Sequence, residues 1–323
     1  MEKLVTDRPT DPSIEIGYRT DGKGNHFGAW STGIKEQSMA DELHLQNSDI
    51  RIDIKTDHGG PESKYPDKNE DVFLAVVDEE GFLLGVIDGA GGSKKGRKAA
   101  CLASEALNHM YKRSPAADLK TIMQAADTHV GENAENGVAT GVVIRAKKEQ
   151  AGWDVQIGAL GDCKVMTIRN GKKHPEGTTN LQNAAALQAL LSKKLEGYYC
   201  DIAQNRIFGG FGLYTRQRLV EEPEILTLKA EAGDQFVAAS DGFWDLVSEY
   251  EIEELSKQYR GKELQKQLYA LAYRRNNSTG PFLIQHDATT TVTKEFTKMY
   301  PPEYAGRKLG DNITIAVVDL LAA

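Results

Sequence analysis

Four aspartates stand next to apolar, strand-like runs, and they are the residues of this sequence best suited to chemistry. Asp71 precedes the run Val72–Val77, and Asp88 follows the run Phe82–Ile87. The turn signal Asp78-Glu79-Glu80-Gly81 separates the two runs, so this stretch predicts a β-hairpin. Because the two arms of the hairpin are nearly equal in length, both carboxylates should reach the same end of it.

A second pair of aspartates repeats this arrangement later in the chain. Asp241 follows the apolar run Phe236–Ser240, and Asp311 precedes the run Ile313–Val318. If these two strands are antiparallel neighbours, their carboxylates also meet at one sheet edge. Each Asp-Gly or Asp-Asn step alone is an ordinary turn former. Four carboxylates at one edge would repel one another, however, so together they predict a site for divalent cations.

The predicted ligands are all oxygens, which suits hard cations such as Mg²⁺ or Mn²⁺. The sequence has no Cys/His cluster at zinc spacing, no Ser-His-Asp elbow and no signature cysteine. Two divalent ions about 3.5–4 Å apart can share a bridging water and lower its pKa. They can also neutralise a phosphoryl group under in-line attack, so no nucleophilic side chain is needed.

The strands that must position these aspartates come in hairpins rather than alternating singly with helices. This order favours an α+β fold with mainly antiparallel sheets and helices packed outside. A capping box, Ser248 with Glu251, marks the start of helices that run to about Arg275. We also expect an edge strand at Ile50–Thr56, strands at Val138–Ala146, Trp153–Leu160, Lys164–Arg169 and Asn312–Leu320, and helices at Lys95–Tyr111, within Leu181–Leu195 and at Thr289–Met299.

The composition limits the class of protein. The chain has 323 residues, 40% hydrophobic and 27% charged, enough for one large domain or a domain with an appendage. Its net charge is −8 and it has no basic block, which argues against nucleic acid as a partner. Three cysteines without a Cys-x-x-Cys pair indicate a reduced compartment. No signal core or membrane-length run is present, so we expect a cytoplasmic protein without a membrane partner, although export without a cleaved signal would look the same.

Six segments of this chain resemble the metal-dependent type-2C (PPM) Ser/Thr protein phosphatase family, and they occur in the family's order. The most specific of them is ASDGFWDLVS, while DGAGG alone would be a weak signal. The resemblance spans the chain from about residue 50 to its end. The segments are NEDVF (69–73), VIDGAGG (86–92), ATGVVI (139–144), ALGDCK (159–164), FVAASDGFWDLVS (236–248) and DNITIAVV (311–318).

The resemblance implies a four-layer α-β-β-α sandwich with a binuclear Mn²⁺/Mg²⁺ centre at one end. Asp88 should bridge the two ions, and the Gly89 carbonyl should be a further ligand. Asp241 and Asp311 should hold one ion, and Asp71 should reach the other directly or through water. These five residues are thus the expected metal ligands.

Two acidic residues have subsidiary places in this expectation. Glu70 should support the ligands around Asp71. Asp162 matches the family position associated with a third, weaker metal ion, and an ordinary hairpin-turn aspartate is the equally good alternative.

Three departures from the family pattern bear on substrate binding. Pro66 stands where many members have a phosphate-clamping Arg, and a Lys in its place would bind phosphate without a bidentate fork. Ala90 stands where eukaryotic members often have a His that protonates the leaving alcohol, and His58 is the candidate acid here. The segment RIFGG (206–210) lacks the usual acidic residue of the flap. Candidates for the clamp are Lys64 and Lys68, with Lys94, Lys95 and Arg97 as further choices.

We therefore expect a phosphatase-like catalytic domain over residues 49–323, with a flap around residues 171–222. Residues 1–48 should form a polar extension of unknown role, either as short hairpins or as a loosely packed arm. The expected activity is hydrolysis of phosphoserine or phosphothreonine in proteins by a metal-activated water. The alternatives are a pseudophosphatase that only binds phosphoproteins, favoured by the missing Arg, and a phosphatase of a small phosphorylated metabolite.

Overall fold

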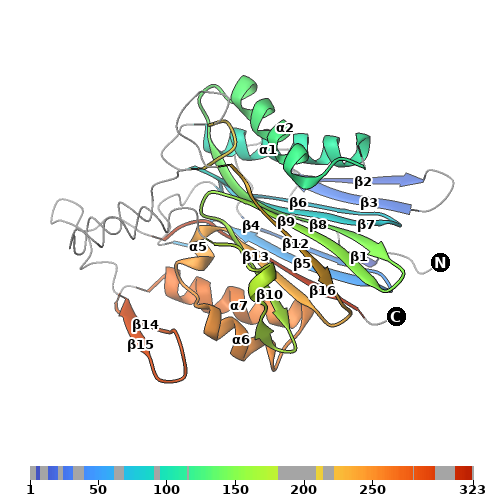
Figure 1. Cartoon of the computed structure of the whole chain (residues 1–323). Coiled ribbons are helices and arrows are strands. Elements are labelled where there is room, and N and C mark those ends of the chain that lie inside the picture. The colour runs from blue at the N-terminus through green and yellow to red at the C-terminus, as the bar shows by residue number, and fades with distance from the viewer. Residues whose placement is uncertain are drawn as a thin grey trace.

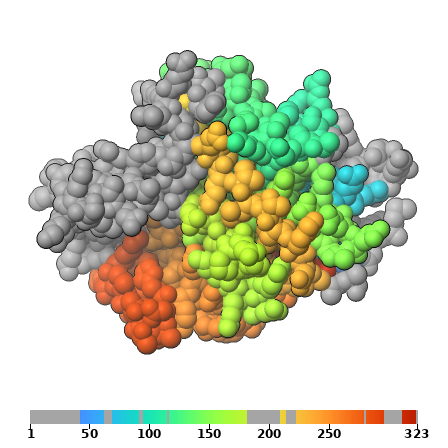
Figure 2. All heavy atoms as spheres, in the orientation of Figure 1, coloured from blue at the N-terminus to red at the C-terminus, as the bar shows by residue number. Residues whose placement is uncertain are grey.

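Two antiparallel sheets pack face to face, and helices cover the outer face of each (Figure 1). This computed structural model describes residues 5–7, 14–20, 25–31, 40–61, 69–90, 95–114, 116–180, 209–213, 222–278, 280–294 and 310–321, and up to residue 41 it describes the backbone alone. Figure 2 gives the same view as spheres, with α1 and α2 (green) above and the C-terminal elements (orange to red) below.

Each sheet has seven strands among the described residues. In order, the first contains β1 (Val5–Asp7), β4 (Ala40–Gln46), β5 (Ile50–Asp57), β16 (Ile313–Leu320), β13 (Gln235–Ala239), β10 (Lys164–Arg169) and β11 (Lys172–Lys173). The second contains β12 (Glu224–Ala230), β9 (Gly152–Leu160), β8 (Ala139–Glu149), β7 (Gly81–Gly89), β6 (Val72–Val77), β3 (Asn25–Ser31) and β2 (Ile14–Thr20).

The helices form the two outer layers. α1 (Gly96–Arg113) and α2 (Leu119–Asn133) pack on the second sheet, and α5 (Asp241–Trp244), α6 (Glu249–Ser256) and α7 (Gly261–Asn276) pack on the first. A short 3₁₀ helix spans Pro175–Gly177, and β14 (Phe282–Gln285) pairs with β15 (Thr291–Lys294) as a separate hairpin. In the described part of the chain, no helix has the combined length and apolarity that a membrane crossing requires.

Strand β6 shows why its sequence is continuously apolar. Phe73, Ala75 and Val77 point into the core between the sheets, whereas Val72, Leu74 and Val76 point into the core beneath α1 and α2. A strand buried on both faces has no solvent side on which a polar residue would be favourable. Full burial of each Val, Leu or Phe stabilises the fold by about 1.5–3 kcal/mol.

The α+β, four-layer architecture expected from the sequence is confirmed. The hairpin of β6 and β7, the strands β8 to β10 and the antiparallel pairing of β13 with β16 are also as predicted. Ser248 and Glu251 form both hydrogen bonds of the capping box that starts α6.

Two predicted elements are wrong. The strand at Ile50–Thr56 is not an edge strand, because β4 pairs along it on one side and β16 on the other. The helix at Thr289–Met299 is replaced over residues 291–294 by β15, where Thr291, Val292 and Thr293 are β-branched residues that pair with β14. Its remaining residues, 295–299, lie outside the described part.

Residues 1–48 contribute strands to both sheets. β2 and β3 extend the second sheet beside β6, and β4 and β1 extend the first beside β5. The domain boundary at residue 48 stays a prediction. The helix within Leu181–Leu195 and most of the flap lie outside the described residues.

Candidate metal centre

Strand register brings the four aspartates to one end of the sandwich. Val72 pairs with Ile87, so Asp71 and Asp88 stand side by side where the β6–β7 hairpin opens. Ala239 pairs with Ile315, so Asp241 and Asp311 lie at the same end of β13 and β16. The Ser240 hydroxyl donates to Asp71 Oδ2 at 2.8 Å, which links the ends of the two sheets. The convergence predicted from the sequence is therefore present.

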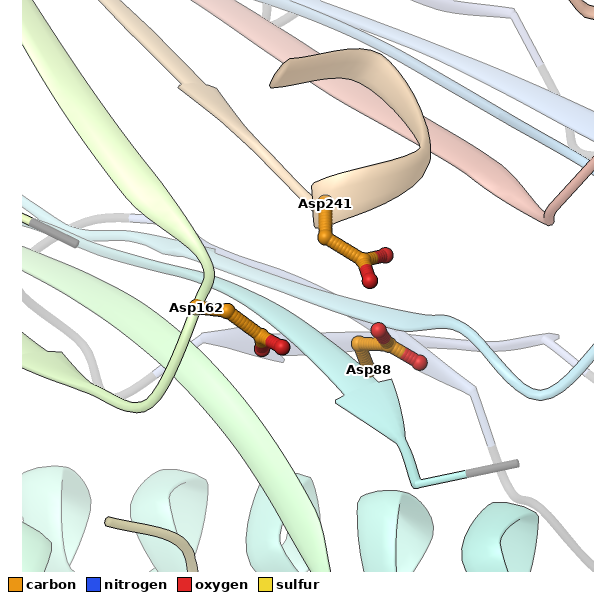
Figure 3. Close-up of side chains that lie close together, drawn as sticks. All are labelled: Asp88, Asp162 and Asp241. Carbon is orange, nitrogen blue, oxygen red and sulfur yellow. The ribbon is translucent and has the colours of Figure 1, made fainter. Parts of the chain in front are cut away.

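Three carboxylates form the closest group of the site. Asp88 at the end of β7, Asp162 in the turn between β9 and β10, and Asp241 at the start of α5 each place one oxygen within 4.8 Å of the others. Figure 3 shows the three side chains pointing toward one another from these separate elements. Asp162 therefore lies beside Asp88 and Asp241, and its role as a metal ligand stays a prediction.

Burial and mutual repulsion favour the protonated forms of these carboxyls. Burial raises the pKa of Asp71 to about 6; hydrogen bonds from Ser240 and Thr314 oppose the rise, and the charge of Asp311 adds to it. Burial likewise raises the pKa of Asp162 to about 6. The pKa of Asp88 lies well above its ordinary value because of burial and then the charges of Asp71, Asp241, Asp162 and Asp311. Without a cation, this end of the molecule holds more negative charge than it can stabilise.

Asp311 and Glu70 are held beside this group by backbone contacts. The charge of Asp311 raises the pKa values of Asp71, Asp88 and Asp162, so its carboxylate lies near all three. Asp311 Oδ1 accepts from the N–H of Asn312 at 3.0 Å. The Asn312 side chain accepts from the N–H of Glu70 at 2.7 Å, so the two segments are tied together.

Gly89 lies where helix α1 approaches the end of β7. A Cβ atom at Gly89 would lie 2.4 Å from the carbonyl carbon of Gly96, closer than any side chain permits. The position therefore requires glycine, and the backbone after Asp88 can pass directly under the helix. The Gly89 carbonyl as a metal ligand stays a prediction.

The residues present fit a divalent cation. Asp71 Oδ1 and Asp162 Oδ1 are buried carboxylate oxygens without a hydrogen-bond partner in the described structure. Buried acceptors normally have a donor, since leaving them unsatisfied costs about 1–3 kcal/mol or more when the group is charged. A hard cation would satisfy these oxygens and remove the repulsion among the aspartates.

The other predicted site residues have different surroundings. His58 follows β5, where its ring Nδ1 lies 3.4 Å from Asp57 Oδ1 and its carbonyl accepts from Asn312 Nδ2 at 3.2 Å. Arg97 donates to the backbone carbonyls of Asn69 and Asp71. Lys95 forms an exposed ion pair with Glu135. Lys64, Lys68 and Lys94 lie outside the described residues, so their roles stay predictions.

Several residues that act on the aspartates were not predicted from the sequence. Ser240 donates to Asp71 and accepts from the N–H of Thr314 at 3.1 Å. The charge of Asp245 raises the pKa of Asp162. Both residues lie within the segment ASDGFWD around Asp241, so their proximity in sequence was a usable signal. Asn276, described below, has no such signal.

Comparison with protein families finds one match. The family model described as "Protein phosphatase 2C" matches residues 66–271, which is more than half of the chain. A comparison with curated proteins finds no match.

Solved structures with the same fold include two structures of the phosphatase PstP and one of a streptococcal phosphatase. The catalytic domain of serine threonine protein phosphatase PstP in complex with two manganese ions is 21% identical, with a TM-score of 0.57 over 85% of this chain and 99% of that one. PstP/Ppp from Mycobacterium tuberculosis gives the same identity and TM-score over 85% of this chain and 100% of that one. A serine/threonine phosphatase from S. agalactiae is 18% identical, with a TM-score of 0.57 over 84% and 99%.

Proposed function

From the finding that the chain belongs to the protein phosphatase 2C family, and is thus a phosphomonoester hydrolase, we propose that it is a Mn²⁺- or Mg²⁺-dependent protein serine/threonine phosphatase. Its substrates would be cytoplasmic phosphoproteins. The observation that carries this proposal is the convergence of Asp88, Asp162 and Asp241 within 4.8 Å. The PstP structure with two manganese ions supports the choice of metal, since it shares this fold.

Each carboxylate has a distinct proposed task. Asp88 would bridge two ions with the Gly89 carbonyl beside it, and Asp71 would complete one of the two ion sites. Asp241 and Asp311 would hold the other ion, and Asp162 would bind a third ion. Ser240 fixes the orientation of Asp71 by donating to its Oδ2, while Glu70 is fixed through Asn312.

The chain's own residues position the phosphoryl group, and the metal supplies the activation. When bound, Mn²⁺ or Mg²⁺ would lower the pKa of a water ligand and neutralise the phosphoryl oxygens during direct attack. Ala90 has no proton to give to the leaving alcohol, so His58 is the candidate acid. Lys64 and Lys68 are the proposed phosphate-binding residues, with Lys94 as a further choice, since Arg97 donates to the carbonyls of Asn69 and Asp71 and Lys95 pairs with Glu135.

The test is hydrolysis of a phosphoserine and phosphothreonine peptide panel with Mn²⁺, with Mg²⁺ and with EDTA. We expect turnover with either metal and none with EDTA. Asp88→Ala and Asp241→Asn should each abolish the metal-dependent turnover while their circular dichroism spectra match that of the wild type. Wild-type turnover in both variants would refute the assignment of these residues.

The same panel separates the two rival functions. A pseudophosphatase would bind phosphopeptides without releasing phosphate under any metal condition. A metabolite phosphatase would release phosphate from small phosphorylated compounds and leave the peptides intact. Either result would replace the protein phosphatase proposed here.

A further inference from the structure

We propose that Asn276 is a positioning residue that fixes the backbone of Asp311 for metal binding. This inference rests on the proposed function, because it takes Asp311 as a ligand. Asn276 is the last residue of α7 and is 3% exposed. Nothing in its local sequence connects it with the aspartates.

The Asn276 amide forms a double hydrogen bond with one residue. Its Oδ1 accepts from the N–H of Asp311 at 3.1 Å, and its Nδ2 donates to the carbonyl of Asp311 at 3.0 Å. The same Nδ2 donates to the carbonyl of Gly59 at 2.9 Å. An amide is the side chain that can accept and donate in this way at once, as two paired peptide groups do in a sheet. The backbone of Asp311 is thereby held on both sides of its Cα atom.

Gly59 makes this arrangement possible. A Cβ atom at Gly59 would lie 1.9 Å from the Asp311 carbonyl oxygen and 2.6 Å from Asn276 Nδ2. Its φ of +88° is also one that other residues rarely adopt. Three segments, the loop after β5, the end of α7 and the chain just before β16, thus meet at the Asn276 side chain.

The rest of α7 makes Asn276 a firm anchor. Leu264, Leu268 and Ala272 bury one side of the helix against the first sheet. Next to Asn276, Arg275 is buried and forms a bidentate pair with Glu251 at 2.6 and 2.8 Å. A side chain fixed at this point can therefore transmit the position of the helix to Asp311.

The long separation of Asp311 from α7 in the sequence gives the bond between Asn276 and Asp311 its importance. Asn276 and Asp311 are 35 residues apart in sequence, and the β14–β15 hairpin lies in the intervening stretch. The family model ends at residue 271, before this stretch. Closing a loop of this length costs conformational entropy. The Asn276 bonds close the base of the loop directly at the proposed ligand.

Asn277 provides a matched control within the same turn. Its Nδ2 donates to the Gly59 carbonyl at 2.9 Å and to the Tyr273 carbonyl at 2.8 Å. It therefore shares the contact with Gly59, while its second bond goes to Tyr273 where that of Asn276 goes to Asp311. Asn277→Ala removes the same atoms as Asn276→Ala, so it tests the loss of turn packing and of the Gly59 contact with the Asn276–Asp311 bonds left in place.

The experiment measures Mn²⁺ binding to the full chain by calorimetry for wild type, Asn276→Ala, Asn276→Asp and Asn277→Ala. Asn276→Asp keeps the shape and the acceptor but loses the donor. Thermal unfolding in EDTA checks each fold, and peptide hydrolysis is followed against Mn²⁺ concentration. Substitution of a residue that supports the metal ligands typically lowers the metal affinity by about 10–100-fold.

We expect both Asn276 variants to weaken one Mn²⁺ site by about 10–100-fold, with kcat recovering at saturating Mn²⁺. Asn277→Ala should bind Mn²⁺ as the wild type does. Equal affinities in wild type and Asn276→Asp, or an equal loss in Asn277→Ala, would overturn the positioning role while leaving the proposed function intact. A wild-type protein that neither binds Mn²⁺ nor hydrolyses peptides would overturn the proposed function and this inference with it.

Discussion

Replacing Asp162 with Asn should stabilise the metal-free protein at neutral pH, although it removes a proposed metal ligand. Asp162 is 6% exposed, and burial together with the charges of Asp245 and Asp311 raises the pKa of its carboxyl from 3.8 to about 6. Asn occupies the same volume and can still accept the hydrogen bond that Thr140 donates to this side chain. It carries no charge to be buried.

The expected stabilisation by Asp162→Asn follows from the difference between the pKa of Asp162 in the folded and in the unfolded chain. The pKa of Asp162 is higher in the folded chain than in the unfolded chain. Its favourable contribution to the free energy of unfolding is therefore complete below about pH 4 and is lost as the pH rises through 6. One pKa unit corresponds to about 1.4 kcal/mol, so ionised Asp162 destabilises the fold by about 3 kcal/mol. With an unfolding entropy of about 2.1 cal/mol/K per residue, the Asn variant should unfold about 4 °C higher.

Thermal unfolding in EDTA, at pH 7.5 and at pH 4, measures this difference. The variant should be more stable at pH 7.5, and the two proteins should nearly coincide at pH 4. The control is Asp287→Asn, because hydrogen bonds from Thr289 and Thr290 lower the pKa of this exposed carboxyl, and the same change there should not stabilise. An Asp162→Asn variant that is no more stable than wild type at pH 7.5 would refute the electrostatic reasoning.

Three further predictions concern the site and its support. Ser240→Ala removes the donor to Asp71 Oδ2, so half-maximal activation should need about 10-fold more Mn²⁺, and an unchanged Mn²⁺ titration would contradict this. Because Ala90 cannot protonate a leaving group, aryl phosphates should be cleaved faster than alkyl phosphates; a flat dependence on leaving-group pKa would contradict this and show that another acid, for which His58 is the candidate, protonates the leaving group. Glu251→Gln breaks the largely buried pair with Arg275 and should lower the free energy of unfolding in urea by about 3 kcal/mol, with unchanged Mn²⁺ affinity; equal urea midpoints in variant and wild type would contradict this.

Local patterns were sufficient to predict the β6–β7 hairpin and the convergence of its two aspartates. An apolar run, a turn signal and a second run of similar length determine which residues face each other. The same reasoning placed Asp241 and Asp311 together, since both stand next to runs of strand-forming residues. These predictions needed no contact between distant parts of the chain beyond the pairing of two strands.

The features that sequence reasoning missed depend on contacts between distant segments. Ile50–Thr56 looked like an edge strand because nothing local shows that β4 pairs along it. The bond between Asn276 and Asp311 joins residues 35 apart, and no spacing rule connects an Asn at a helix end with a strand that follows a long loop. Asp162 could equally be read from the sequence as an ordinary turn residue, because its neighbours Asp88 and Asp241 come from other elements.

The proposed metal centre is tested most directly by the anomalous diffraction of a crystal soaked in Mn²⁺, measured at the manganese absorption edge. At least two manganese peaks should lie at coordination distance from the aspartates, with Asp88 a ligand of both. A soaked crystal in which no peak lies beside Asp88 or Asp241 would contradict the claim that these carboxylates converge to bind metal.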